Sequence, residues 1–537
     1  MSPSEPPVSS RYASSDRVSA RRIRGLAKDL EARLDGDVRL DPTSRKTYST
    51  ASGAYAIEPL GAVSPRHEED CRRVLECLRE REIPIIARGA GTGMGGHNVG
   101  SGVLLDFTTH MDAGLEPQPD RGLVRVQPGI VRDALNERLA ASGRFFAPDP
   151  SSTARCTVGG MAANNAGGLR TVRYGSTKHH VEGLRAVLPD GTALALGRET
   201  TQPADPRFDR IREAIEAASD AIRAEPPGPE KHASGYDVWG LLERFDPTRL
   251  FVGSEGTLGL LTELTLRTEP VPPSRATLLA AFRSLEGMGE AVRLARTEGA
   301  SVIELMDRTL LDAVRAVDLH FEVDVPEDAE ALLLIEVVGN DSDESATKLD
   351  AMRAALSDPA LDPCLLQTAT DADEQDRLWS VRKSSSPIIA RRTDDKKTLQ
   401  IVEDGGVEPE RVVDYVRGIR RIFADAGIEV IQFGHASSGN IHVNPLFDVT
   451  RRDFPQQVRR VADAVTELII GLGGTLTAEH GDGRVRAPYL ARRFPRLVSL
   501  FETIKKTLDP ENLMNPGVIL PLPGQQVEHH LRYPEAR

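Results

Sequence analysis

Apolar positions recur with helical and strand-like spacing in the first half of the chain. Between residues 66 and 82, Cys71, Val74, Leu75 and Leu78 lie three or four positions apart among charged residues, which predicts an amphipathic helix. The uncharged run from Ile83 to Ala87 follows and predicts a buried strand. The same patterns predict strands at 103–106 and 123–127, a second helix at 130–142, and a hairpin over 184–196 that turns at Asp190-Gly191.

A composition break at Glu269-Pro270-Val271-Pro272-Pro273 predicts a linker between two domains. Beyond it, the apolar pattern predicts strands at 301–305, 331–337 and 430–433, and helices at 284–298, 345–357, 408–426, 453–471 and 495–507. Strands and helices are mixed and include a hairpin, so we expect an α+β fold rather than pure βαβ winding.

Length and charge narrow the class of protein. The chain has 537 residues, which predicts at least two domains, and its formal charge of −13 without a long Lys/Arg run argues against a nucleic-acid or anionic-membrane surface. Four scattered cysteines predict a reducing, cytoplasmic compartment. The sequence contains no run of eighteen apolar residues, so we expect no transmembrane segment. The first twenty residues are rich in Ser, Pro and Arg, which predicts a disordered tail rather than a secretory signal.

A glycine-rich loop follows the strand at 83–87. Gly91-Thr92-Gly93-Met94-Gly95-Gly96 matches the G-x-G-x-x-G dinucleotide pattern, but residues 97–102 lead directly into another strand and leave no room for the helix that pattern requires. The glycines could still hold phosphates through backbone N–H groups. Further glycine- and amide-rich segments suit the close approach of a large ligand with a diphosphate: Pro148 to Ser152, Thr157 to Met161, Asn164 to Gly168, Tyr174-Gly175 and Gly253 to Gly259.

A second group of candidate functional residues lies in the C-terminal part of the sequence. His435 and His442 stand seven residues apart around Gly439-Asn440, and Glu479-His480 follows in another glycine-rich segment. Two imidazoles and a carboxylate form the ligand set of a catalytic divalent ion with an open position, and His480 is placed to move a proton. This pattern alone is compatible with hydrolysis as well as with redox chemistry.

These motifs resemble a known family in one consistent order. Arg88 to Thr92, Gly159-Gly160, Asn164 to Gly168 and Gly253 to Gly259 resemble the PCMH-type FAD-binding domain of vanillyl-alcohol-oxidase flavoproteins. Gly434 to His442, Glu479 to Gly483 and Asp509 to Gly517 resemble the FAD-linked oxidase cap domain of D-2-hydroxyacid dehydrogenases. The resemblance implies a two-part FAD-binding domain plus an α+β cap, divided as a tail (1–25), the FAD-binding domain (26–270), the cap (271–520) and a loose tail (521–537).

The resemblance also implies which residues surround the cofactor. Thr92 stands where some relatives carry the histidine that tethers FAD, so we expect a dissociable flavin, and His97 is expected to be an ordinary loop histidine. The implied FAD-binding residues are Arg88, Gly89, Ala90, Gly91, Thr92, Gly93, Pro128, Gly129, Asp149, Ser152, Gly159, Gly160, Asn164, Gly168, Glu255 and Asn515.

In the cap, the resemblance implies His435, His442 and Glu479 as ligands of zinc, with manganese, iron or cobalt as alternatives. His480 is the implied base, which accepts the hydroxyl proton while the C2 hydride passes to flavin N5. Arg382, in Trp379-Ser380-Val381-Arg382, is the implied clamp for the substrate carboxylate. The remaining implied substrate residues are Ser386, Asn444 and Lys397, with Lys396 as the alternative lysine.

Two departures from the family pattern bear on function. Ser437-Ser438 replace a Gly-Asp pair common in relatives, which changes local charge but not ligand spacing. The segment from Glu479 to Leu490 is most similar to longer members with a C-terminal iron–sulfur domain, whose cluster ligands four scattered cysteines cannot supply. We therefore expect electrons to pass to a separate acceptor, either an iron–sulfur subunit, an electron-transfer flavoprotein, a cytochrome or a quinone, with peripheral membrane association only through that partner.

The resulting prediction is an FAD-dependent dehydrogenase of D-lactate, glycolate or D-2-hydroxyglutarate. Three alternatives remain open: a flavoenzyme of the alkyl-glycerone-phosphate synthase kind, a metallohydrolase without flavin, and a non-catalytic FAD redox subunit. The sequence leaves the substrate's tail and the oligomeric state open, with a homodimer among the alternatives.

Overall fold

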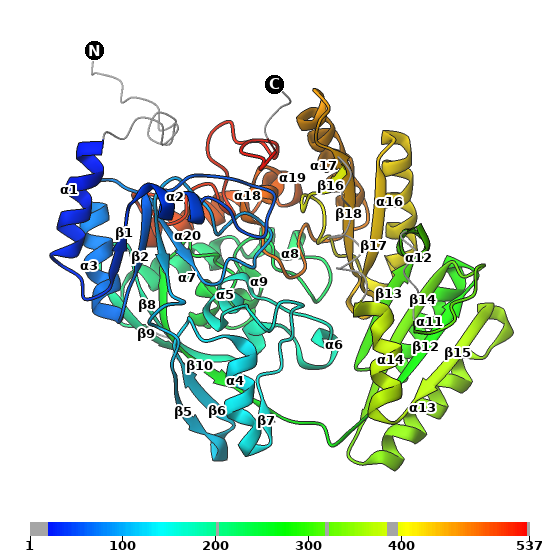
Figure 1. Ribbon diagram of the computed structural model, residues 1–537. Helices are drawn as coiled ribbons and strands as arrows, with labels where there is room; N and C mark the ends of the chain where they lie inside the picture. Colours follow the sequence, from blue (N-terminus) through cyan, green and yellow to red (C-terminus); the bar gives the residue numbers. More distant parts are fainter. Residues whose placement is uncertain (1–19, 200–202, 317–321, 384–395, 534–537) are drawn as a thin grey trace.

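The computed structural model describes residues 20–199, 203–316, 322–383 and 396–533 (Figure 1). A four-stranded sheet forms the first part of its N-terminal body. Its strand order is β1-β2-β4-β3, with β2, β3 and β4 parallel and β1 antiparallel to β2. The elements are α1 (Ala20–Glu31), β1 (Asp37–Arg39), α2 (Pro42–Tyr48), β2 (Gly61–Ser64), α3 (Glu68–Arg79), β3 (Ile85–Arg88) and β4 (Val103–Asp106).

Helix α3 confirms the prediction at 66–82, because its apolar stripe of Cys71, Val74, Leu75 and Leu78 is buried. The connection from β3 to β4 contains no helix, as expected from residues 97–102. The glycine-rich segment is therefore a loop at the end of a buried strand, and it lies free to line a cavity rather than to start a crossover helix.

A five-stranded antiparallel sheet completes the N-terminal body, in the order β5-β6-β10-β8-β9. The predicted hairpin forms between β8 and β9, and Gly191 has a φ of +85° in its turn. The elements are β5 (Gly114–Gln118), β6 (Leu123–Val126), α4 (Arg132–Leu139), β7 (Arg144–Phe145), α5 (Val158–Asn164), α6 (Thr171–Tyr174), β8 (Val181–Val187), β9 (Ala193–Gly197), α7 (Arg207–Ala217), α8 (Ser219–Ala224), α9 (Val238–Glu243), α10 (Thr248–Phe251), β10 (Leu260–Arg267) and β11 (Glu269–Pro270).

The predicted linker is partly ordered by the first body, because β11 pairs with β7 before the chain crosses over. The C-terminal body is built on a seven-stranded antiparallel sheet, in the order β15-β12-β14-β13-β17-β18-β16. Its elements are β12 (Ser274–Phe282), α11 (Leu285–Thr297), β13 (Val302–Asp307), α12 (Arg308–Ala316), β14 (Ala331–Gly339), α13 (Ser342–Leu356), β15 (Pro363–Ala369), α14 (Ala372–Lys383), β16 (Lys396–Thr398), α16 (Val412–Ala426), β17 (Glu429–His435), β18 (Asn440–Asp448) and α17 (Phe454–Gly471).

Both faces of this sheet are covered (Figure 1). Leu278 and Ala280 face a core shared with α11, α13 and α16, whereas Leu279 and Ala281 face a second core under α12 and α14. A strand buried on both sides needs apolar residues at every position, which explains the nearly unbroken apolar run of β14.

Within the expected cap range of 271–520, the last helix packs on the N-terminal body. Phe501 and Ile504 of α20 (Val498–Leu508) join the core of the N-terminal body, and Asn515 N–H donates to Ile85 O at 2.8 Å. Helices α18 (Gly483–Arg486) and α19 (Leu490–Arg493) lead this return. Apolar spacing predicts that α20 exists but not which core it joins, because two cores of similar composition compete for it.

Both termini also differ from the expected tails. Helix α1 begins at Ala20, inside the range 1–25. The segment 521–533 is packed rather than loose: Val527 is buried, its carbonyl accepts from Tyr55 Oη at 2.6 Å, and Arg532 N–H donates to Ala54 O at 2.7 Å. No helix in the described part of the chain has both the length and the hydropathy needed to cross a bilayer.

Candidate active site

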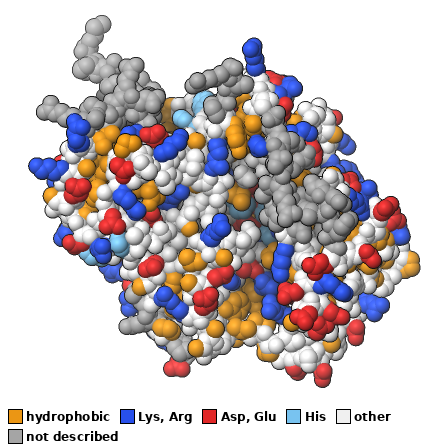
Figure 2. Space-filling model, in the orientation of Figure 1, with side chains coloured by type: hydrophobic (Ala, Val, Ile, Leu, Met, Phe, Trp, Pro, Cys, Tyr) orange, Lys and Arg blue, Asp and Glu red, His pale blue; other side chains and the backbone are white. Residues whose placement is uncertain are grey.

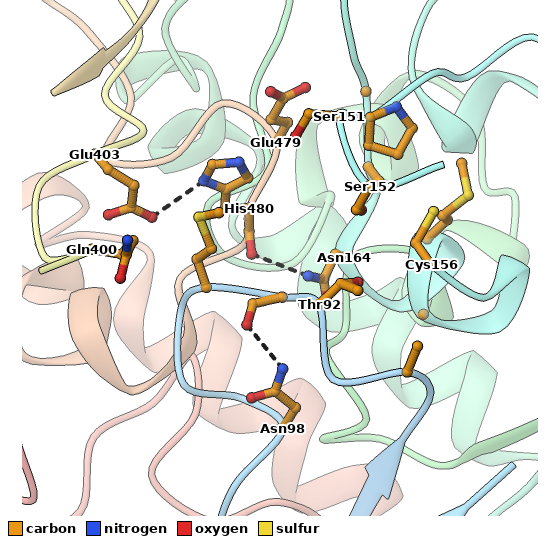
Figure 3. Close-up of a pocket in the computed structure, with 18 of the residues that line it drawn as sticks. Thr92, Asn98, Ser151, Ser152, Cys156, Asn164, Gln400, Glu403, Glu479 and His480 are labelled. Carbon is orange, nitrogen blue, oxygen red and sulfur yellow. Dashed lines mark hydrogen bonds and ion pairs between the residues drawn. The ribbon is translucent and has the colours of Figure 1, made fainter. Parts of the chain in front are cut away.

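A cavity of about 720 Å³ lies where the two bodies meet, within the roughly 300–1,000 Å³ typical of small-molecule sites. The N-terminal body contributes glycine-, alanine- and serine-rich loops to its wall, and the C-terminal body contributes histidines, carboxylates and Arg382. Figure 3 shows the two sets facing each other, with Thr92 and Asn164 on one side and Glu403 and His480 on the other. The protein thus joins a small-residue cradle to a cluster of titratable groups.

The glycine-rich loop forms the cradle. Gly91 has a φ of +71°, which favours glycine, and Asn98 Nδ2 donates to Gly93 O at 2.9 Å within the loop. Arg88 supports the loop from behind, since its guanidinium donates to the carbonyls of Thr50 at 3.0 Å and of Asn98 at 3.2 Å. Arg88 therefore shapes the loop and does not line the cavity.

The predicted FAD-binding residues fall into two groups. Those that line the cavity are Gly89, Ala90, Gly91, Thr92, Gly93, Ser152, Gly160, Asn164 and Glu255. Those that stand behind its wall are Arg88, Pro128, Gly129, Asp149, Gly159, Gly168 and Asn515.

The second group has clear packing roles. Gly159 N–H donates to Pro128 O at 2.8 Å, and Asn515 Nδ2 donates to the carbonyls of His97 at 2.7 Å and Glu255 at 2.8 Å. Asp149 accepts from Arg170, which also binds Glu336 of β14 through two hydrogen bonds of 2.8 and 3.0 Å. Asp149 thus belongs to a buried ion-pair network that ties the two bodies together.

His97, expected to be an ordinary loop histidine, lines the cavity and contacts two of the predicted FAD-binding residues. Its ring lines the cavity, with Nε2 3.0 Å from Asn164 Nδ2 and Nδ1 3.2 Å from the Glu255 carboxylate. Glu255 in turn accepts from the backbone N–H groups of Asp482 and Gly483 at 2.7 and 2.8 Å. This chain of contacts joins the cradle to the segment that carries Glu479 and His480.

The three predicted metal ligands converge on one point. His435 ends β17 and His442 lies on the neighbouring β18, and their Nε2 atoms are 3.2 Å apart. Glu479 Oε1 lies 3.1 Å from His435 Nε2 and 3.6 Å from His442 Nε2. Donor atoms about 2.0–2.2 Å from one tetrahedral ion lie about 3.3–3.6 Å apart. The observed separations of 3.1, 3.2 and 3.6 Å therefore come within about 0.2 Å of the spacing around a shared divalent cation.

The outer hydrogen bonds of both histidines also suit metal ligation. His435 Nδ1 bonds the Glu304 carboxylate at 2.5 Å, and His442 Nδ1 bonds Glu403 O at 3.2 Å, so both Nε2 atoms are directed into the cavity. Burial and the neighbouring His435 and His480 lower the pKa of His442 to about 3, which keeps its Nε2 lone pair available. Burial opposes ionisation of Glu479, but Lys231 and His435 outweigh it and hold the pKa of that carboxyl well below its usual range.

Asp404, His442, Glu479 and His480 form a second group whose ligand atoms lie close together. The Asp404 carboxylate is already engaged, because its Oδ2 accepts from the backbone N–H groups of residues 478, 479 and 480 at 3.0, 3.0 and 2.8 Å. Its Oδ1 accepts from Asn440 Nδ2 at 3.1 Å. Asp404 therefore shapes the loop that presents Glu479, and we favour His435 as the third ligand.

His480 is oriented by a buried carboxylate. Its Nδ1 donates to Glu403 Oε1 at 3.2 Å (Figure 3). Glu403 also forms an ion pair with Arg486, with Oε1 and Nη2 2.8 Å apart. Burial favours the neutral ring, but the charges of Asp404 and Glu403 outweigh it and raise the pKa of His480 to about 9. A divalent cation on Glu479 opposes this effect, because its positive charge disfavours the imidazolium next to it.

The predicted substrate residues are only partly brought together. Arg382 and Asn444 line the cavity. The Arg382 guanidinium lies over the Phe433 ring, with Cζ 4.6 Å from the ring centroid. Lys396 and Lys397 do not line it, whereas Thr398 and Gln400 from the same stretch do. Ser386 lies outside the described residues.

Three buried charges of the site were not among the predicted residues. Glu304 and Glu403 hold the histidines, and Lys231 Nζ lies 2.8 Å from Glu479 Oε2 and 3.1 Å from Asn440 Oδ1. An acidic residue inside the apolar strand 302–307 and the pair Glu403-Asp404 before Gly405-Gly406 were available signals. Nothing in the local sequence distinguishes Lys231 from a surface lysine.

Two family models together match most of the chain. Residues 59–197 match a family model described as FAD binding domain, and residues 271–519 match one described as FAD linked oxidases, C-terminal domain. The chain is 31% identical to the glycolate oxidase subunit GlcD of Bacillus subtilis (strain 168), over 92% of this chain and 97% of that protein. It is 29% identical to a D-lactate dehydrogenase of Archaeoglobus fulgidus, over 87% of this chain and 92% of that protein.

A D-2-hydroxyglutarate dehydrogenase of Pseudomonas putida is 29% identical over 90% of this chain, but the match spans only 50% of that longer protein. Among solved structures, p-cresol methylhydroxylase with substrate bound superposes with a TM-score of 0.69 at 15% identity, over 95% of this chain and 99% of that one. An alkyldihydroxyacetonephosphate synthase superposes with a TM-score of 0.62 at 16% identity, over 92% and 85%. At such low identity these two structures establish the fold alone.

Proposed function

The chain belongs to the family of FAD-linked oxidases and has its two-domain PCMH-type FAD-binding fold, and from this premise we propose that it is a D-2-hydroxyacid dehydrogenase. Membership makes the protein an FAD-linked oxidoreductase and removes the flavin-free metallohydrolase from consideration. The proposed substrates are D-lactate, glycolate or D-2-hydroxyglutarate, in keeping with the names of the relatives.

One observation carries the proposal: His435, His442, Glu479, His480 and Arg382 line the same cavity as the glycine-rich cradle. Bound FAD would supply the hydride acceptor, and a divalent ion on the two histidines and Glu479 would supply a Lewis acid. In the proposal, Arg382 pairs with the substrate carboxylate and so directs the C2 carbon toward the cradle. His480, held through Nδ1 by Glu403, accepts the hydroxyl proton at Nε2.

The electrons then leave through a separate acceptor. The described cysteines do not support an internal cluster, since Cys71, Cys77 and Cys156 are buried in the N-terminal body and Cys364 lies in the other. We propose an iron–sulfur subunit, an electron-transfer flavoprotein, a cytochrome or a quinone as that acceptor. Figure 2 shows lysine and arginine side chains interspersed with acidic ones on the visible face, so charge alone does not select among these partners.

Dye-linked reduction assays on a panel of D- and L-2-hydroxy acids test the proposal. We expect reduction of an artificial electron acceptor with at least one of D-lactate, glycolate and D-2-hydroxyglutarate, and a preference for D- over L-lactate. The same preparation with added 2-oxo acid serves as the control for product inhibition. No reduction with any 2-hydroxy acid would contradict the proposed activity.

Replacing Gly91 by valine is expected to remove most of the bound FAD. Gly91 has a φ of +71° and lines the cradle, and a Cβ at this position would lie 2.8 Å from an Arg88 guanidinium nitrogen, so a β-branched side chain both strains the backbone and displaces the arginine that supports the loop. Gly143→Val is the matched control, because Gly143 has a φ of +64° but faces open space away from the cavity. The FAD-to-protein ratio, read from flavin and protein absorbance, should fall at least about 10-fold in G91V relative to G143V.

Equal FAD content in the two variants would show that the loop at Gly91 does not hold the cofactor. The released flavin also tests the expectation of a dissociable cofactor, since acid precipitation should leave FAD in the supernatant of the wild type.

A further inference from the structure

Glu304 touches two residues of the proposed site at once without lining the cavity itself. It lies on β13, its side chain is fully buried, and its Oε1 accepts from His435 Nδ1 at 2.5 Å. Its Oε2 accepts from Arg382 Nε at 2.8 Å. One carboxylate thus contacts both a proposed metal ligand and the proposed carboxylate clamp.

The chemistry of these contacts allows only one type of group at position 304. An imidazole N–H and a guanidinium N–H both donate, so the residue between them must accept at two oxygens, which a carboxylate does. A buried carboxylate is costly unless it is paired and fully hydrogen-bonded. The free-energy cost of burying the Glu304 carboxylate is therefore offset by its hydrogen bonds to His435 and Arg382, the two residues that it orients.

Each contact constrains one neighbour. The bond to Glu304 holds a proton on His435 Nδ1, which leaves Nε2 as the ligating atom beside Glu479 Oε1, 3.1 Å away. The bond from Arg382 Nε fixes the edge of the guanidinium that faces Glu304, while Phe433 packs under the guanidinium plane.

We propose that Glu304 is a positioning residue that couples the metal site to the substrate clamp, by fixing His435 and Arg382 relative to each other. This inference rests on the proposed function, which assigns the metal to His435 and the substrate carboxylate to Arg382. Because the two partners share one carboxylate, loss of Glu304 affects metal affinity and substrate affinity together.

Glu304→Gln tests the proposal. Glutamine offers one oxygen and one NH2 group, so one of the two donors must face another donor. If His435 adapts, its proton moves to Nε2 and blocks ligation; if Arg382 adapts, the clamp loses its anchor. We expect zinc affinity, measured by competition with a chromogenic chelator, to fall about 10- to 100-fold, and the KM for the hydroxy acid at saturating zinc to rise about 10-fold.

Asp307→Asn is the matched control. Asp307 is a fully buried acid on the same strand, but it binds Arg420 at 3.0 Å and Gln432 at 3.1 Å, away from the cavity. We expect D307N to lower thermal stability without changing zinc affinity or KM. FAD content and thermal unfolding check that both variants are folded, and E304D, which keeps the charge on a shorter side chain, replaces E304Q if that variant does not accumulate.

A double-mutant cycle separates the two arms of the coupling. In an Arg382→Ala background, E304Q should raise KM little further but should still weaken zinc binding. Zinc affinity equal to that of the wild type in E304Q, or the same loss in D307N, would overturn the proposal. Zinc affinity is read without substrate, so a wild type that oxidises no hydroxy acid would contradict the proposed function and leave this comparison decisive for Glu304.

Discussion

Replacing His480 by alanine is expected to lower turnover of the hydroxy acid by about 10²- to 10⁴-fold, the usual contribution of a positioned general base. Glu403 bonds Nδ1 of His480 at 3.2 Å, which leaves Nε2 to accept the hydroxyl proton in the proposed reaction. Without that acceptor, hydride removal from C2 has to await proton loss to water. Steady-state kinetics with an artificial electron acceptor measure the change, and FAD content should stay at the wild-type level.

His110→Ala is the matched control, because His110 also pairs with a carboxylate, Asp37, at 3.0 Å but lies outside the cavity. It should retain wild-type turnover. Undiminished turnover in H480A would favour the alternative of an FAD redox subunit that uses no base. A change in KM alone would assign His480 to substrate binding instead of proton transfer.

Replacing His435 by alanine is expected to remove the divalent ion and to lower turnover about 10³-fold or more, equivalent to about 4 kcal/mol of the barrier. This variant also separates the two candidate ligand sets. If His435, His442 and Glu479 hold the ion, H435A loses it; if Asp404, His442, Glu479 and His480 hold it, H435A keeps it. The metal content of purified protein, measured by elemental analysis, gives the answer without an activity assay.

Chelation extends the same test to the wild type. Removal of the ion should abolish most turnover while FAD remains bound, and zinc, manganese or cobalt added back should restore it to different extents. Activity that survives complete metal removal would contradict the metal role but not the proposed substrate class. His442→Ala should lose the ion under either ligand set, and therefore calibrates the loss seen in H435A.

The local sequence pattern predicted most elements of the fold, because the spacing of apolar residues shows which face of each helix or strand is buried. The stripe of Cys71, Val74 and Leu78 has the period of a helix, and the unbroken apolar run of β14 reflects burial on both faces of a sheet. Pattern did not predict that α20 and residues 521–533 return to the N-terminal body. An apolar face specifies that it is buried, and only the competition between two cores specifies where.

The candidate site divides in the same way. The glycine-rich loop, the two histidines and Glu479-His480 are motifs whose residue types carry chemistry in a short stretch, so the sequence predicts them as candidates. Glu304, Glu403 and Lys231 act from other strands and loops, at separations of 131, 77 and 248 positions from His435, His480 and Glu479, respectively. Their pairing depends on the register of β13 against β17 and on the packing of the two bodies.

The sequence by itself therefore determined the two-domain α+β class, the family resemblance and the residue types available for cofactor, metal and proton transfer. Tertiary structure alone decided which of these residues line one cavity, which stand behind its wall, and which buried charges orient the histidines. The physical reason is that helix and strand periods depend on neighbours a few positions apart. The direction of an imidazole or a guanidinium depends instead on hydrogen-bond partners that folding brings from distant parts of the chain.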